Sequence, residues 1–178
     1  MAAPRNIDLH HLTGKWMLNK ALSDDISPIL ALQGTNTILR KAISSASVTL
    51  SISQPNTNEY KIHQTATAAS IPGTTEQYIL DNEWRKNSDA FFGEVDGRSR
   101  WIDLDEAKSI EGVQGHWEQG DGKLILAEGG KPDGSWSATR VWGFEEIGND
   151  RRYTQRVKVW SKDGKEVRVN MVYDFVQE

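Results

Sequence analysis

The sequence predicts an all-β protein: a closed antiparallel barrel of about ten strands, with a helix-turn-helix lid between the first two strands. Three observations support this prediction. Apolar and polar residues alternate with a period of two along most of the chain from residue 48 onward. Turn-forming residues interrupt this alternation at intervals of roughly 8–14 residues. No crossover helix separates the later strands, and parallel strands would need one.

The first strand and the lid come before residue 48. Residues 14–20 form the first predicted strand. Two short apolar helices follow at residues 26–32 and 36–46, and Gly34 separates them. The apolar stripe of these helices, which includes Leu39, is expected to pack on the mouth of the barrel, because such stripes usually face a core.

The remaining strands follow one another with turns between them. We expect a turn at residues 70–73, and the Asp163-Gly164 pair predicts a tight hairpin because it tolerates positive φ. Residues 105–111 are expected to form a long loop. No linker or repeat divides the chain, so residues 1–178 are predicted to form a single domain. The predicted strands cover residues 48–53, 60–66, 74–86, 91–104, 115–119, 123–128, 136–146, 153–161 and 167–176.

The composition argues against several classes of function. The 178 residues include no cysteine, so disulfides and thiolate metal ligands are excluded. The net charge is −4 and no basic tract stands out, so we expect no nucleic-acid partner. No apolar run is long enough for a membrane span and the N-terminus lacks a signal-peptide core, so we expect a cytoplasmic protein without a membrane partner. None of the four histidines has metal-ligand spacing, and no metal or other cofactor is expected.

Alternate residues of a barrel strand face the lumen, and the last three strands have the clearest inward faces. Arg140 and Trp142 share one of these faces. On the strand at residues 74–86 we take the inward parity to be that of Gln77. A buried charge is costly unless it is paired, so a lumenal Arg140 is either structurally paired or in contact with an anionic or polar ligand. Other expected inward residues are Tyr153, Gln155, Met171, Tyr173, Ile79, Asp81, Glu83, Arg85, Trp101 and Asp103.

Several short stretches point to a known family. They are Gly14-Lys15-Trp16, the Arg40-Lys41 pair, residues 75–80 and Val172-Tyr173-Asp174. Together with the order of elements, they resemble the intracellular fatty-acid-binding-protein branch of the calycin barrels. Met171, however, stands where that family has a carboxylate-binding arginine, which argues against a simple fatty acid. The chain has seven tryptophans, which favour a flatter, aromatic ligand.

The chain is also similar to a fungal group of lipocalin-like proteins, on residues 14–25, Arg40-Lys41-Ala42 and residues 97–101. Members of this group accompany secondary-metabolite pathways. Some act as cofactor-free cyclases of polyketide intermediates, and one such reaction is the intramolecular addition of a phenol to a prenyl alkene. The resemblance implies a related activity for this chain.

We therefore expect a cofactor-independent cyclase or isomerase that acts on an aromatic polyketide or prenylated phenolic intermediate by acid–base catalysis. Asp81, Glu83 and Asp103 are the candidates for a buried acid of raised pKa, unless they are surface or structural carboxylates. Arg140 or Arg85 would hold a phenolate or enolate oxygen. The expected substrate-binding residues are Trp142, Trp101, Tyr173, Met171, Tyr153, Gln155, Gln77, Ile79, Arg85 and Leu39.

Two other functions fit the same pattern. A carrier that binds a hydrophobic or aromatic small molecule needs the barrel, the lid and a cavity, but no chemistry. A domain that binds another protein needs no cavity. The sequence leaves open whether the chain is a monomer or a homodimer.

Overall fold

The computed structural model describes residues 1–66, 73–89 and 91–176. The turn expected at residues 70–73 lies outside this range, apart from Gly73. The described chain forms one ten-stranded antiparallel sheet in the order β4-β3-β2-β1-β10-β9-β8-β7-β6-β5. The strands are β1 (Gly14–Leu18), β2 (Val48–Asn56), β3 (Glu59–Ala66), β4 (Thr74–Ile79), β5 (Arg85–Asp89), β6 (Gly93–Asp103), β7 (Lys123–Gly130), β8 (Trp136–Ile147), β9 (Asp150–Ser161) and β10 (Glu166–Val176).

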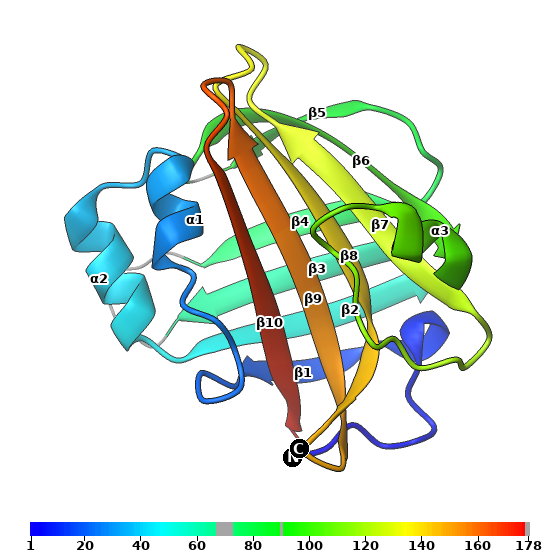
Figure 1. Ribbon diagram of the computed structural model, residues 1–178. Coiled ribbons are helices and arrows are strands. Elements are labelled where there is room, and N and C mark those ends of the chain that lie inside the picture. The colour runs from blue at the N-terminus through cyan, green and yellow to red at the C-terminus, as the bar shows by residue number, and fades with distance from the viewer. Residues whose placement is uncertain (67–72, 90, 177–178) are drawn as a thin grey trace.

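The sheet curls on itself, so that β2, β3 and β4 run across β8, β9 and β10 on the other side of a shared interior (Figure 1). The two edge strands, β4 and β5, are not joined by a ladder. Instead, Ser99 of β6 bridges toward the β4 end: its hydroxyl donates to the Ile79 carbonyl at 3.1 Å, and its carbonyl accepts from the Asn82 N–H at 2.9 Å. The all-β antiparallel prediction is confirmed, but the closed barrel is overstated, because the sheet is a curled half-barrel.

Three predicted segments differ from the structure. Residues 74–86 form two strands, β4 and β5, and the turn between them contains Asn82 in a left-handed backbone conformation with φ of 67°. Asparagine tolerates this conformation better than most residues. The expected loop after β6 contains a short helix, α3 (Leu104–Ser109). Residues 115–119 form no named strand, and Trp117 makes an isolated bridge to Glu145 of β8.

Two helices between β1 and β2 lie at one end of the half-barrel, α1 (Ser27–Leu32) and α2 (Thr37–Ser45) (Figure 1). Ile29 of α1 is buried in a cluster with Trp136 and with valines of β9 and β10. The predicted helical insert is therefore confirmed, and its first helix covers one end of the interior. No helix in the described part of the chain is long and apolar enough to cross a membrane.

The opposite end is filled by the larger core and the short helix η1 (Leu9–His11). Trp16 is fully buried there, and its indole N–H donates to the Leu12 carbonyl at 3.1 Å. The Tyr60 hydroxyl donates to the Leu9 carbonyl. The N- and C-terminal segments meet at this end (Figure 1), where the Phe175 N–H donates to the Met1 carbonyl at 3.0 Å. The space left for a ligand thus lies between two apolar clusters.

Candidate functional site

A cavity of about 480 Å³ borders the gap between the two edge strands. Residues of β4 line one side of it, and residues of β5, β6, β7 and β8 line the other. Gln33, which follows α1, contributes at the covered end. The volume falls in the range that small-molecule sites occupy, about 300–1,000 Å³.

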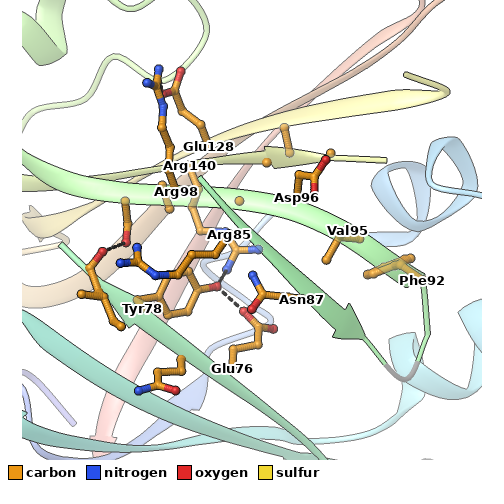
Figure 2. A pocket seen from close by; sticks show the side chains of 18 of the residues that line it. Glu76, Tyr78, Arg85, Asn87, Phe92, Val95, Asp96, Arg98, Glu128 and Arg140 are labelled. Atoms are coloured by element: carbon orange, nitrogen blue, oxygen red, sulfur yellow. Dashed lines mark hydrogen bonds and ion pairs between the residues drawn. The ribbon is translucent and has the colours of Figure 1, made fainter. Parts of the chain in front are cut away.

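Three side chains from opposite walls meet through one hydroxyl group (Figure 2). Glu76 and Tyr78 share the inward face of β4, because side chains two residues apart on a strand point the same way. The Tyr78 hydroxyl donates a hydrogen bond to Glu76 Oε2. It also accepts one from Arg140 Nη1 of β8, at 3.3 Å. The ring of Tyr78 packs edge-on against buried Trp142, with centroids 4.6 Å apart.

Arg140 keeps its positive charge although it lies inside the protein. Desolvation by burial works to lower its pKa, but neighbouring groups, Tyr78 first and then Glu76, raise the pKa above its usual range. At neutral pH the tyrosines are uncharged, so among these neighbours Glu76 carries the compensating charge. In the described part of the chain Arg140 makes one hydrogen bond, although a guanidinium has five N–H donors.

Below Arg140 lies a buried polar layer. Gln155 Nε2 donates to the Tyr153 hydroxyl at 2.7 Å, and the Tyr173 hydroxyl lies 3.7 Å from the Met171 sulfur. Burial raises the pKa of both Tyr153 and Tyr173, so both hydroxyls stay protonated at neutral pH. Tyr153 and Tyr173 also belong to the larger apolar cluster.

The apolar wall of the cavity combines small residues with aromatic ones. Gly97, Gly129 and Ala138 are cross-strand neighbours on β6, β7 and β8. All three line the cavity, as do Phe92 and Trp136, whose ring centroids are 5.6 Å apart. Ala138 leaves room that a larger side chain would fill, which suits a broad or flat ligand. Gly129 instead lets β7 approach β6 closely, because a Cβ atom there would lie 2.7 Å from the Asp96 carbonyl oxygen.

The structure brings together most of the residues predicted for the last three strands. Arg140 lies in the cavity wall, and Trp142 packs beside Tyr78. Tyr153, Gln155, Met171 and Tyr173 lie in or next to the polar layer below it. Gln77, Ile79 and Arg85 also line the cavity, near the gap between the edge strands.

The expected acids lie elsewhere, so their predicted lumenal placement is wrong. Asp81 and Glu83 are exposed in the turn between β4 and β5. The hydrogen bond from Arg85 lowers the pKa of Asp81 to about 2, the opposite of the raised pKa expected for an acid. Asp103 is exposed at the end of β6 and pairs with Lys123.

Among the expected contact residues, Gln77, Ile79 and Arg85 line the cavity, and Trp142 and the residues of the polar layer do not. Trp101 and Leu39 lie away from both the cavity and the polar layer. Trp101 stacks on His10 with centroids 4.5 Å apart, and its indole N–H donates to Asn58 Oδ1 at 3.0 Å. It therefore belongs to the closed end of the half-barrel. Leu39 is half-buried on α2 and does not line the cavity.

Sequence reasoning missed Glu76 and Tyr78, because it chose the other parity on β4. The alternation in the sequence does not decide the parity of this strand, but the structure does. Thr74 and Leu80 are buried, and they share the parity of Glu76 and Tyr78. Among the described residues, no group of three or more His, Asp or Glu side chains could hold a metal ion.

Solved structures share this fold at low sequence identity. Lipid binding protein 8 of Caenorhabditis elegans matches with a TM-score of 0.64 and 15% identity, covering 92% of this chain and 94% of that one. A REP1-NXSQ fatty acid transporter matches with a TM-score of 0.61 and 14% identity, covering 94% and 97%. The fluorescent protein UnaG matches with a TM-score of 0.60 and 15% identity, covering 93% and 97%. The chain therefore shares the fold of these three proteins, as expected.

Two fungal proteins are similar to the chain along almost its full length. One is a probable pericyclase, scpY, of Mollisia scopiformis, with 26% identity over 98% of this chain and 95% of that protein. The other is the pericyclase pydY of an Acremonium species, with 28% identity over 99% and 97%. No protein-family profile matches the chain. The predicted resemblance to fungal proteins of secondary metabolism is confirmed.

Proposed function

We propose that this chain is a cofactor-free cyclase of the pericyclase type, which closes a ring within a small conjugated molecule of secondary metabolism. The observation that carries the proposal is the buried guanidinium of Arg140 in the wall of a cavity of about 480 Å³. The similarity to two proteins named as pericyclases supports the same class of reaction.

A concerted ring closure rearranges bonding electrons within one molecule and releases nothing, so it needs no group that the chain lacks. The protein then has two tasks. The first is to hold the substrate folded with its reacting carbons close together, which can remove several kcal/mol of entropic barrier, on the order of 7–11 kcal/mol in the best cases. The walls around Ala138 and Trp136 serve this task. The second is to stabilise charge that develops on a substrate oxygen, and Arg140 serves that one.

The addition of a phenol to an alkene within one substrate is a second candidate. It needs a base for the phenol and an acid for the alkene, and the Tyr78–Glu76 hydrogen bond supplies a proton donor and an acceptor side by side. A carrier without chemistry is the alternative that the fatty-acid-binding neighbours favour. All three functions use the same cavity, so activity has to decide between them.

The test uses an extract of the producing fungus from which the gene for this chain has been deleted. We expect the purified protein to convert one compound of this extract into an isomer of equal mass, with a new retention time and one handedness. Arg140→Met should slow this conversion by at least about a hundredfold, as does the loss of one electrostatic donor in other enzymes. Arg168→Met is the matched control, because Arg168 is exposed on β10 and pairs with Glu111 and Glu166. A compound that binds and is returned unchanged after denaturation would favour the carrier.

A further inference from the structure

The hydroxyl group of Tyr78 stands between two groups of opposite charge (Figure 2). We propose that Tyr78 exchanges a proton with the substrate, that Glu76 takes up this proton, and that Arg140 holds the resulting oxyanion. The substrate would then be a molecule with an ionisable hydroxyl group, a phenol or the enol of a dicarbonyl, conjugated to the part that reacts. This inference rests on the proposed function and names the substrate class of the same site.

The two charges of the site are paired in an unusual way. Buried arginine and glutamate side chains normally neutralise each other in a direct ion pair. In the described part of the chain Glu76 and Arg140 make no such pair, and the Tyr78 hydroxyl is the hydrogen-bond partner of both. Arg140 therefore keeps donors for an oxygen that the protein itself does not supply.

The two charges also act on the charge that a ligand carries as it enters the cavity. A carboxylate would arrive already charged, and Glu76 would repel it at the place where Arg140 attracts it. A phenol or enol arrives neutral and meets no such repulsion. It becomes an anion beside Arg140 at the moment when Glu76 becomes neutral, so the net charge of the site does not change. The pair thus selects for an oxygen that ionises inside the cavity.

The proton moves in two linked transfers. The substrate O–H bond breaks and its proton goes to the Tyr78 oxygen, while the proton that Tyr78 held goes to the Glu76 carboxylate. The electron pair of the broken bond stays on the substrate oxygen, which the Arg140 guanidinium holds. An oxyanion donates electron density into the conjugated system attached to it, which makes that system more reactive toward an electron-poor partner. The proton returns by the same path after the ring has closed.

The test uses umbelliferone, a flat phenol whose neutral and anionic forms absorb at different wavelengths, and its methyl ether, which cannot ionise. We expect the protein to bind umbelliferone about tenfold more tightly than the ether, the ratio that corresponds to one hydrogen bond to a charged group. We also expect binding to lower the pKa of the dye by about one unit or more, because a cation lies beside its oxygen. Binding is followed by quenching of tryptophan fluorescence, and the pKa by absorbance titration.

The variants separate the three roles. Arg140→Met should lose both the pKa shift and the preference over the ether, because its cation causes both. Tyr78→Phe and Glu76→Gln keep this cation and should still lower the dye pKa, but the bound dye should then release its proton to the solvent instead of to Glu76, which a pH indicator detects in weakly buffered solution. Glu59→Gln is the matched control, because Glu59 lies on β3 with Lys61 and Gln77 as its partners. It should behave as the wild type, and near-native circular dichroism is required of every variant.

Equal binding of dye and ether, an unchanged dye pKa, or binding of neither compound would overturn the inference. These results are independent of turnover. If the protein closes rings in the fungal extract and yet leaves the dye pKa unchanged, the proposed cyclase function is supported and the proposed proton exchange is wrong. If the protein lowers the dye pKa and converts nothing, the site ionises its ligand as part of a binding protein, and the proposed cyclase function is wrong.

Discussion

Filling the cavity should make the protein more stable and less active at once. Ala138 lies in the cavity wall on β8, between Gly129 of β7 and Val159 of β9. Ala138→Leu adds three carbons that point into open space. At about 0.8 kcal/mol for each buried carbon the gain is about 2.4 kcal/mol. Fixing the leucine rotamer costs about 0.5–1 kcal/mol, which leaves a net gain of about 1.5–2 kcal/mol.

For a domain of this size, a gain of that order raises the melting temperature by about 3–8 °C, which differential scanning calorimetry resolves. In the same variant, turnover in the fungal extract should fall steeply, because the leucine occupies the space of the substrate. Ser137→Leu is the control, since it adds more volume to the opposite face of the same strand. If Ala138→Leu were less stable than the wild type, or had native turnover, this wall would not enclose the cavity that binds the substrate.

Two further changes test parts of the chain outside the cavity. Glu145→Ala should lower the free energy of unfolding by about 3 kcal/mol in urea titrations, because buried Glu145 is the carboxylate partner of Arg156 at 2.9 Å. The control is Glu146→Ala at the exposed neighbouring residue, which should change the free energy of unfolding by less than about 0.5 kcal/mol. Equal losses in the two variants would contradict this prediction. The pKa of Asp81 is lowered to about 2 by its hydrogen bond from Arg85, so its stabilising effect is complete above the usual carboxyl pKa and is lost as the pH falls toward 2. Melting curves of Asp81→Asn should therefore lie below those of the wild type at neutral pH and converge with them near pH 2, and a constant difference would rule this out.

The sequence could predict one wall of the site because β8, β9 and β10 are long and uninterrupted. Over 11 or 12 residues the alternation has one consistent phase, so Arg140, Tyr153 and Tyr173 were placed correctly relative to one another. The other wall depends on β4, which has only six residues. Both parities of this strand mix polar and apolar side chains, and the alternation by itself does not choose between Glu76 and Gln77.

The error on β4 also displaced the predicted acids. The sequence pattern predicts a single strand at residues 74–86, and on one strand Asp81 and Glu83 would share the face of Gln77. The left-handed residue Asn82 breaks that continuity, and the chain turns outward before β5 begins. Asp81 has the outward parity of β4, and the left-handed turn at Asn82 leaves Glu83 exposed as well. Such a break is not visible in hydrophobic periodicity, because asparagine is also common in ordinary turns.

Trp101 lies outside the cavity although its predicted inward parity on β6 is correct. It is opposite Ile125 on β7, and Ile125 is itself opposite Trp142. The N-terminal segment reaches this end of the sheet and places His10 over the Trp101 ring. No local pattern in residues 1–13 predicts this contact, since it joins segments about ninety residues apart. Where another segment of the chain fills one end of the interior, strand parity identifies the inward side chains but cannot tell which of them a ligand reaches.

The arrangement of the two apolar clusters explains how the fold tolerates such a site. The open cavity lacks packing contacts, and the charge of Arg140 is removed from water without a complete set of partners. Both features reduce the free energy of unfolding. The clusters lie at the two ends, one around Trp16 and Tyr60 and the other around Ile29 and Trp136. Each is complete without the cavity residues Glu76 and Arg140. Changes at Glu76 and Arg140 should therefore alter chemistry with little effect on folding, whereas changes in the larger cluster around Trp16 should reduce stability with little effect on chemistry. This separation is what allows the variants at Glu76, Tyr78 and Arg140 to be interpreted as tests of function.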